Sequence, residues 1–92
     1  MMLTANQSLY HWRTTTGAEV DFVIRSGNTV IPIEVKYSNF EKVEVNRSLR
    51  SFIEAYHPPK ALIVNKSFEG QLDVSGTEVI ALPFYSDLSK HM

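Results

Sequence analysis

The chain has 92 residues, of which 43% are hydrophobic, 21% charged and 11% aromatic, a composition typical of one small folded domain and unlike that of disordered or membrane-spanning chains. Cysteine is absent, which excludes a disulfide scaffold, a thiolate nucleophile and a cysteine-ligated metal site. The formal net charge of −1 argues against binding of nucleic acid through bulk positive charge, although a local basic face stays open. The sequence contains no secretory signal and no apolar stretch of about 18 residues, so we expect a cytoplasmic protein.

The first half of the sequence predicts three strands. Two stretches rich in aromatic and β-branched residues, LYHWRTTT from Leu9 and EVDFVIR from Glu19, are separated by a glycine and predict two strands. The turn residues 26–29 precede the apolar run Val30–Val35, which predicts a third strand joined to the second as a hairpin. Pro32 has no backbone N–H to donate, so we expect an edge-facing position or a bulge there.

Side chains alternate between the two faces of a strand, so the hairpin has one polar and one apolar face. On the third strand we expect Glu34 and Lys36 to share a face, with Asp21 of the second strand on the same side and near Glu34. The other positions follow from the same alternation: Val20, Phe22 and Ile24 share one face of the second strand, Glu19, Val23 and Arg25 lie with Asp21, and Ile31, Ile33 and Val35 share the apolar face of the third.

The second half of the sequence predicts one helix and two more strands. A helix over roughly Asn46–Tyr56 follows from an apolar stripe at helical spacing, with its N-cap at the first residue and two prolines beyond its end. Residues 61–64 predict a strand buried on both faces, 66–77 indicate a loop, and 78–83 predict a last strand. A helix between two strands is a crossover that joins parallel neighbours, so we expect a mixed sheet. The helical stripe comprises Leu49, Phe52, Ile53 and Tyr56.

Three charged residues interrupt strands that are otherwise apolar. Asp21 and Glu34 beside the backbone carbonyl of Val35 would form an oxygen-rich site suited to magnesium, and Lys36 could orient or deprotonate a water molecule or counter charge that develops on a phosphate. The simpler interpretation is that these charges pair or are solvated on the surface of a sheet, and spacing alone favours it. The context of the three residues is what favours a functional site.

That context is an acidic residue on one strand, Glu-x-Lys on the next strand, a short turn between the two strands and a helix after them. In this arrangement the sequence resembles the PD-(D/E)XK nuclease superfamily. Asp21 matches the first motif and Glu34-Val35-Lys36 the second. The resemblance implies an α/β fold with a restriction-endonuclease-like mixed β-sheet and a crossover helix. It also implies hydrolysis of DNA phosphodiester bonds that depends on Mg²⁺ or Mn²⁺, with metal ligands from Asp21, Glu34 and Val35 and catalytic roles for Asp21, Glu34 and Lys36.

A longer series of residues carries a narrower resemblance. The segments YHWR at 10–13, GAEVDFV at 17–23 and IPIEVKY at 31–37, with Ser48-Leu49 and Phe52 beyond them, resemble the nuclease-like C-terminal domain, of unknown function, of prokaryotic AAA-type ATPases. The resemblance implies that residues 1–92 are a single nuclease-like domain with its core at about 9–83, that it is a C-terminal fragment of a longer ATPase, and that the ATPase module is its partner. The helix that usually begins such folds is missing, and the sequence has no G-x-x-x-x-G-K-[ST] phosphate loop.

Two functions of different classes remain open. The first is a nuclease-like domain, inactive as an isolated fragment, whose DNA contacts would come from a basic face. The second is a non-catalytic module of the ATPase that binds DNA or protein or associates with itself. Because the initial helix is missing, we expect a partly uncovered apolar face of Val20, Phe22, Ile24, Ile31 and Ile33 and therefore a homo-oligomer. The candidate DNA contacts are Arg13, Lys42, Arg47 and Arg50.

Overall fold

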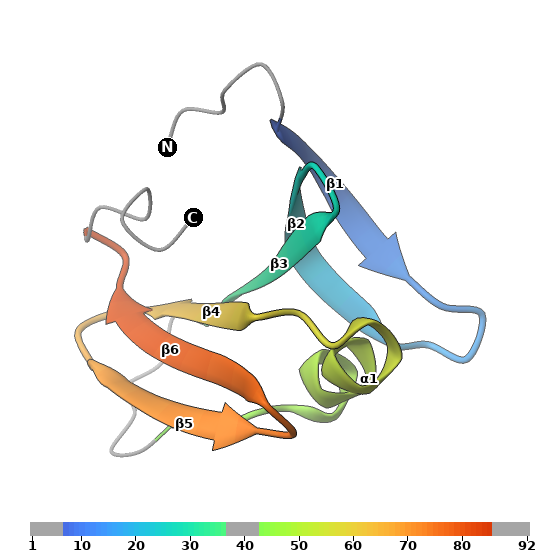
Figure 1. Ribbon diagram of the computed structural model, residues 1–92. Coiled ribbons are helices and arrows are strands. Elements are labelled where there is room, and N and C mark those ends of the chain that lie inside the picture. Colours follow the sequence, from blue (N-terminus) through green and yellow to red (C-terminus); the bar gives the residue numbers. More distant parts are fainter. Residues whose placement is uncertain (1–6, 37–42, 86–92) are drawn as a thin grey trace.

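The computed structural model describes residues 7–36 and 43–85 as one layer of strands with a helix packed on it (Figure 1). Six strands form a single sheet in the order β1-β2-β3-β4-β6-β5. The elements are β1 (Gln7–Arg13), β2 (Glu19–Ser26), β3 (Thr29–Val35), α1 (Arg47–Tyr56), β4 (Lys60–Asn65), β5 (Gly70–Val74) and β6 (Thr77–Pro83).

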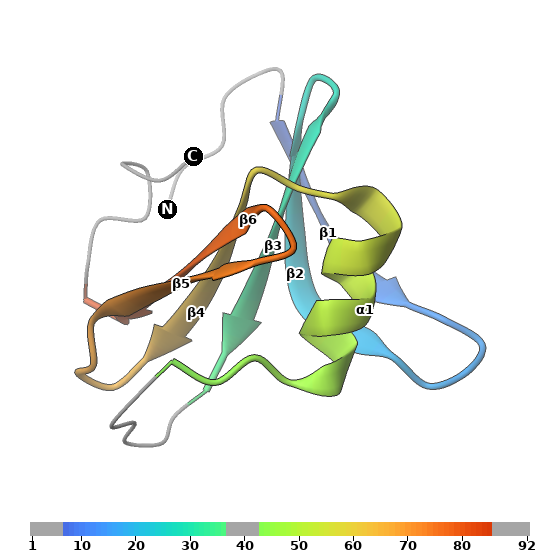
Figure 2. The same cartoon turned by 60° about the horizontal axis from the view of Figure 1, so that its bottom comes forward.

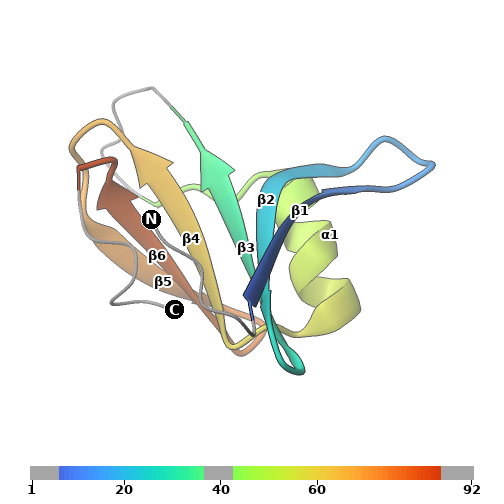
Figure 3. The same ribbon diagram turned by 90° about the horizontal axis from the view of Figure 1, so that it is seen from above.

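The sheet combines antiparallel hairpins with a parallel centre. β1, β2 and β3 pair antiparallel in chain order, β4 is parallel to both β3 and β6, and β5 pairs antiparallel with β6. α1 is the crossover between the parallel strands β3 and β4. The sheet is strongly twisted, so that β1 and β5 at its two edges run in clearly different directions (Figure 3). The predicted mixed α/β sheet with a crossover helix is therefore confirmed.

The helix begins and ends where the sequence predicts. Asn46 is the N-cap, and its Oδ1 accepts a hydrogen bond of 2.7 Å from the backbone N–H of Leu49. His57 follows the last turn in the left-handed conformation, with φ of 48°, and Pro58 prevents further helix. The buried stripe of α1 faces the sheet over β2 and β3 (Figure 2). No helix within residues 7–36 and 43–85 is long and apolar enough to cross a membrane.

Apolar side chains form two clusters, one on each face of the sheet. The cluster on the helix side joins the buried residues of α1 to side chains of β2, β4, β5 and β6. The cluster on the other face consists entirely of strand residues packed against their neighbours. Adjacent residues of β4 alternate between the two clusters, which confirms that this strand is buried on both faces. The second cluster comprises Ile24, Ile31, Ile33, Leu62, Val64, Ile80 and Leu82.

The expected uncovered apolar face is not present in the described part of the chain. Val20 and Ile24 are 0% exposed, and Ile31 and Ile33 are 4% and 2% exposed. Only Phe22, at 43%, has a largely accessible side chain. Val20 lies in the cluster on the helix side, and Ile24, Ile31 and Ile33 pack with residues of β4 and β6 on the other face. Self-association stays a prediction, but this face gives no physical reason for it.

A β-bulge changes the predicted faces of β2. Tyr10 pairs with Val23 and Trp12 with Val20, so two β2 residues, Asp21 and Phe22, lie opposite a single residue of β1. Val20 and Val23 consequently both enter the cluster on the helix side, whereas Ile24 enters the other. The prediction that Val20 shares a face with Phe22 and Ile24 is therefore wrong, because strict alternation fails at the bulge. Asp21 and Phe22 are the two residues of the bulge, and both are exposed.

Pro32 lies in the central strand β3 without a bulge of its own. The Lys36 N–H donates to the Val64 carbonyl of β4, and alternate residues of a strand direct their N–H groups the same way. Position 32 would therefore direct a donor toward β4. The pairs with β4 begin only at Ile33, so the missing N–H costs no ladder hydrogen bond. The predicted edge or bulge is replaced by a position just outside the parallel pairing.

Residues 66–77, predicted as a loop, contain the edge strand β5. This strand joins β6 through the two-residue turn Ser75-Gly76, whose φ angles are 52° and 87°, as a tight hairpin requires. Only Val74 of β5 is buried, so the strand has almost no apolar pattern and its existence depends on pairing with β6. The Ser-Gly turn was the one local signal that could have indicated it.

Candidate functional site

The candidate site lies where the pairing of β2 and β3 ends. The last backbone pair of these strands is Phe22 with Ile33. Beyond it, the backbone N–H of Val35 donates a hydrogen bond of 2.9 Å to Oδ2 of Asp21 rather than to a strand carbonyl. The Asp21 side chain is exposed, and this hydrogen bond engages only one of its two carboxylate oxygens.

Glu34 lies on the face of β3 that carries the helix. Its neighbours Ile33 and Val35 belong to the opposite face, as the sequence predicted. The residue is only 6% exposed, and its Oε2 accepts a hydrogen bond from Nδ2 of Asn46 at the start of α1. Burial of a carboxylate between a strand and a helix end is costly unless partners surround it.

Lys36 follows β3 directly. Its backbone N–H donates a hydrogen bond of 2.7 Å to the carbonyl of Val64, which holds the end of β3 against β4. The residue is half-buried. Because residues two apart on a strand share a face, its side chain leaves the backbone on the same side as that of Glu34.

The electrostatics of Glu34 show that Asp21 and Lys36 lie close enough to act on its carboxyl group. Desolvation by burial raises the pKa of the Glu34 carboxyl above its ordinary value, and the negative charge of Asp21 raises it further. Hydrogen bonds from the Asn46 side chain and the Asp21 backbone lower this pKa, as does the positive charge of Lys36, but the net direction is upward. The fold therefore brings Asp21, Glu34 and Lys36 into one electrostatic neighbourhood.

The donor set at this site fits a hard divalent cation. It offers the carboxylates of Asp21 and Glu34. The backbone carbonyl of Val35 also points toward β2, because the N–H and C=O of one residue lie on the same edge of a strand and the Val35 N–H reaches Asp21 of β2. Magnesium uses one or two carboxylates together with waters and phosphate oxygens. Within the described residues no group of three His, Cys, Asp or Glu side chains is placed to hold a metal, so a fully protein-enclosed metal site is not formed there.

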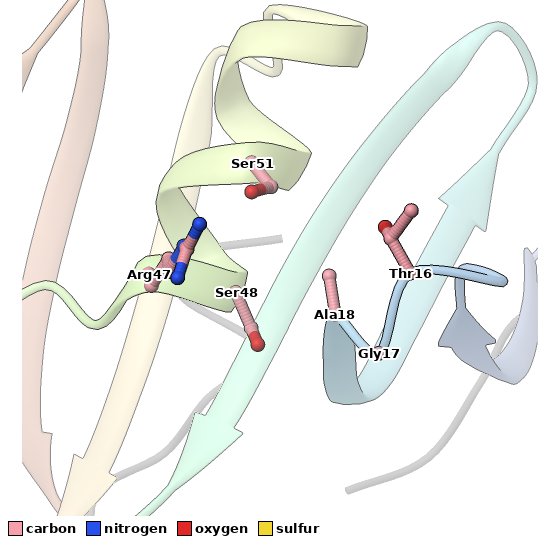
Figure 4. A pocket seen from close by; sticks show the side chains of 6 residues that line it. All are labelled: Thr16, Gly17, Ala18, Arg47, Ser48 and Ser51. Carbon is pink, nitrogen blue, oxygen red and sulfur yellow. The ribbon is translucent and has the colours of Figure 1, made fainter.

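A polar cavity of about 260 Å³ lies between the β1–β2 loop and the first turns of α1 (Figure 4). The backbone N–H of Glu19 donates a hydrogen bond of 3.1 Å to Oγ of Ser48 and ties the loop to the helix. Hydroxyl groups and one guanidinium line the cavity and no carboxylate does, a chemistry typical of contacts to phosphate groups. The lining residues are Thr16, Gly17, Ala18, Arg47, Ser48 and Ser51.

The four basic residues predicted to contact DNA have different surroundings. Arg47 lines the cavity, and Arg50 is exposed one turn further along α1. Arg13 forms an ion pair of 3.0 Å with Glu19, so its charge is already compensated. Lys42 lies outside the described residues.

Sequence reasoning missed the second role of one residue and the cavity beside it. Asn46 was predicted as a helix cap alone, but its amide also contacts Glu34. The cavity was missed because it needs the β1–β2 loop and α1, which lie about 30 residues apart, to be adjacent. The only available signal for the contact with Glu34 was the use of Asn rather than another good capping residue. No local pattern in the sequence indicated the cavity.

The fold and this site define a small mixed α/β domain with a charged cluster at the end of its central hairpin. The chain belongs to the family described as a domain of unknown function (DUF4143), which it matches over residues 2–85. Members of this family are typically found in AAA-ATPase-associated proteins. No curated protein matches the chain.

Proposed function

We propose that this domain is a PD-(D/E)XK-type, restriction-endonuclease-like module of an AAA-type ATPase that hydrolyses DNA phosphodiester bonds with the aid of Mg²⁺ or Mn²⁺. The observation that carries the proposal is the convergence of Asp21, Glu34 and Lys36 at the end of the β2–β3 pairing. An antiparallel hairpin that carries the acids, a lysine two residues after the second acid and a crossover helix to a parallel strand support it further.

The residues have distinct roles in this proposal. The carboxylates of Asp21 and Glu34 and the carbonyl of Val35 hold the cation, which when bound supplies Lewis-acid polarisation of a phosphate oxygen. Lys36 donates a hydrogen bond to the attacking water and counters the charge on the phosphate. The water oxygen bonds to phosphorus as the bond to the leaving alkoxide breaks; the water proton passes to solvent, and the alkoxide takes a proton from solvent.

The surplus negative charge of the free site supports cation binding. The pKa of Glu34 is raised because its charge is desolvated and lies near Asp21, and a cation between the two carboxylates would relieve both effects. A surface ion pair without function gains nothing from burial of one partner. The burial of Glu34 is thus better explained by a ligand than by solvation of a strand.

A second candidate function is DNA binding without cleavage, which the cavity lined by Arg47 favours. A guanidinium and several hydroxyls suit a phosphate of the DNA backbone, which positions a protein without reading sequence. Cleavage and binding are separable, because Lys36 would be needed for the first and Arg47 for the second.

The test combines metal binding and cleavage. Isothermal titration with Mn²⁺ should show binding by the chain and a loss of affinity of about tenfold or more in Asp21→Asn, with the exposed Asp73→Asn as a matched control. Nicking of supercoiled plasmid by the longest natural form of the protein should require the metal and should disappear in Lys36→Ala but not in the exposed Lys66→Ala. Cleavage that is absent, or unchanged by both site variants, contradicts the nuclease proposal, and retained DNA binding would then favour the second candidate.

A further inference from the structure

Asn46 uses both ends of its side-chain amide. Oδ1 accepts the hydrogen bond from the Leu49 N–H that caps α1, at 2.7 Å. Nδ2 donates to Oε2 of Glu34. One half-buried side chain therefore connects the start of the helix to the carboxylate of the candidate metal site.

The two contacts fix the orientation of the amide. A flipped amide would direct its NH₂ group at the Leu49 N–H and its oxygen at the Glu34 carboxylate, which sets donor against donor and acceptor against acceptor. The cap alone would be served as well by Ser, Thr or Asp, each of which offers the same acceptor. Of the good capping residues, only Asn offers an N–H donor on a different atom from its acceptor, so the contact with Glu34 accounts for Asn at a position where the helix would accept several residues.

The hydrogen bond limits the freedom of a buried carboxylate that has few partners. Oε2 is engaged by Asn46, the Asp21 backbone also hydrogen-bonds to this carboxyl, and Asp21 and Lys36 act on it through their charges. A carboxylate held at one oxygen by an outer partner presents the other in a defined direction, as outer partners of metal ligands do generally. Without this hydrogen bond the Glu34 side chain would populate more than one rotamer in its partly charged, partly apolar surroundings.

We propose that Asn46 is the positioning residue of this site: its amide holds Oε2 of Glu34 so that the other oxygen is presented to a divalent cation, and ties this arrangement to the first turn of α1. The cation part rests on the proposed function, whereas the orientation of Glu34 does not. Because Arg47 is the next residue in the chain and lines the cavity, the same amide also fixes the helix start from which that cavity is built.

The decisive variant is Asn46→Ser, which retains an acceptor for the Leu49 N–H and removes the amide donor. Asn46→Ala removes both, and Asn28→Ser, in an exposed turn, is the matched control. Two readouts are measured on the whole chain: the side-chain rotamer of Glu34 by NMR couplings without metal, and Mn²⁺ affinity by titration calorimetry. Circular dichroism with urea unfolding reports whether each variant keeps its helix.

The expected result for Asn46→Ser is a helix content close to that of the unaltered chain, a lower unfolding midpoint at neutral pH because the buried Glu34 carboxylate loses a donor, averaged Glu34 couplings and a Mn²⁺ affinity about tenfold lower. Asn46→Ala should add a loss of helix stability, and Asn28→Ser should change neither readout. A single retained Glu34 rotamer with unaltered couplings in Asn46→Ser overturns the inference. If the unaltered chain binds no Mn²⁺, the proposed function fails, and the metal-free couplings alone decide the role of Asn46.

Discussion

Replacement of Glu34 by Gln should make the domain more stable at neutral pH. The carboxylate is 6% exposed, and its pKa lies above the ordinary value of 4.5 because desolvation outweighs its favourable partners. Gln has nearly the same shape, and its Oε1 can accept the hydrogen bond from Asn46. The substitution therefore removes a penalised charge and leaves the packing unchanged.

The size of the gain follows from opposing effects. Desolvation of a charge costs several kcal/mol, and a hydrogen bond to a charged group returns about 1.5–3 kcal/mol. Because the pKa of Glu34 is raised, the cost exceeds the return, and Glu34→Gln removes the surplus. In a domain of this size each kcal/mol of stability gained raises Tm by about 4–8 °C.

The pH dependence provides the sharper test. A folded state with a raised carboxyl pKa binds its proton more tightly than the unfolded chain, so stability falls as pH rises from about 4.5 through the raised pKa of Glu34 and then levels off. Below that window Glu34 is protonated in both states, and the advantage of Glu34→Gln should vanish. Urea unfolding at pH 4 and pH 7, with the exposed Glu54→Gln as control, measures both. A variant less stable than the unaltered chain at pH 7, or a difference independent of pH, refutes the reasoning.

Two further substitutions test how the fold is held. Asn65→Ala should cost about 2–4 kcal/mol in urea unfolding, because this buried amide donates to the carbonyls of Phe68 and Leu82 and accepts from the N–H groups of Ser67 and Phe68; a loss below about 0.5 kcal/mol would show that water replaces these bonds. Gly76→Ala should cost about 1 kcal/mol in the same assay, because φ is 87° although no atom lies within 4 Å of the added methyl. An unchanged midpoint there would mean that the β5–β6 turn relaxes freely.

The parts of the fold that were predicted correctly are those with strong local signals. The helix was predicted because its apolar stripe, its cap at Asn46 and the prolines after His57 all lie within one short segment. The strand 61–64 was predicted because four consecutive apolar residues have no other use in so short a run. The placing of Glu34 opposite Ile33 and Val35 was predicted because alternation holds along β3 in the structure.

The parts that failed depend on partners distant in sequence. Val20 was placed on the wrong face because a bulge arises from the register of two strands, and neither strand encodes it alone. β5 was missed because pairing with β6, rather than its own pattern, makes it a strand. The contact between Asn46 and Glu34 needs a connecting segment to fold back on β3, which no periodicity reports.

The bulge and the site have a common cause. At Asp21 the β2 strand carries one residue more than β1, and beyond Phe22 and Ile33 the ladder to β3 ends. The N–H of Val35 is left without a backbone acceptor from β2, and the Asp21 carboxylate takes its place. A sheet that continued its pairing would direct this N–H at a carbonyl and would leave no place for a carboxylate between the strands. The local interruption of the ladder therefore places the Asp21 carboxylate between the strands. The buried Glu34 carboxylate beside it lowers stability at neutral pH, but it is the second carboxylate that this position would need in order to hold a cation.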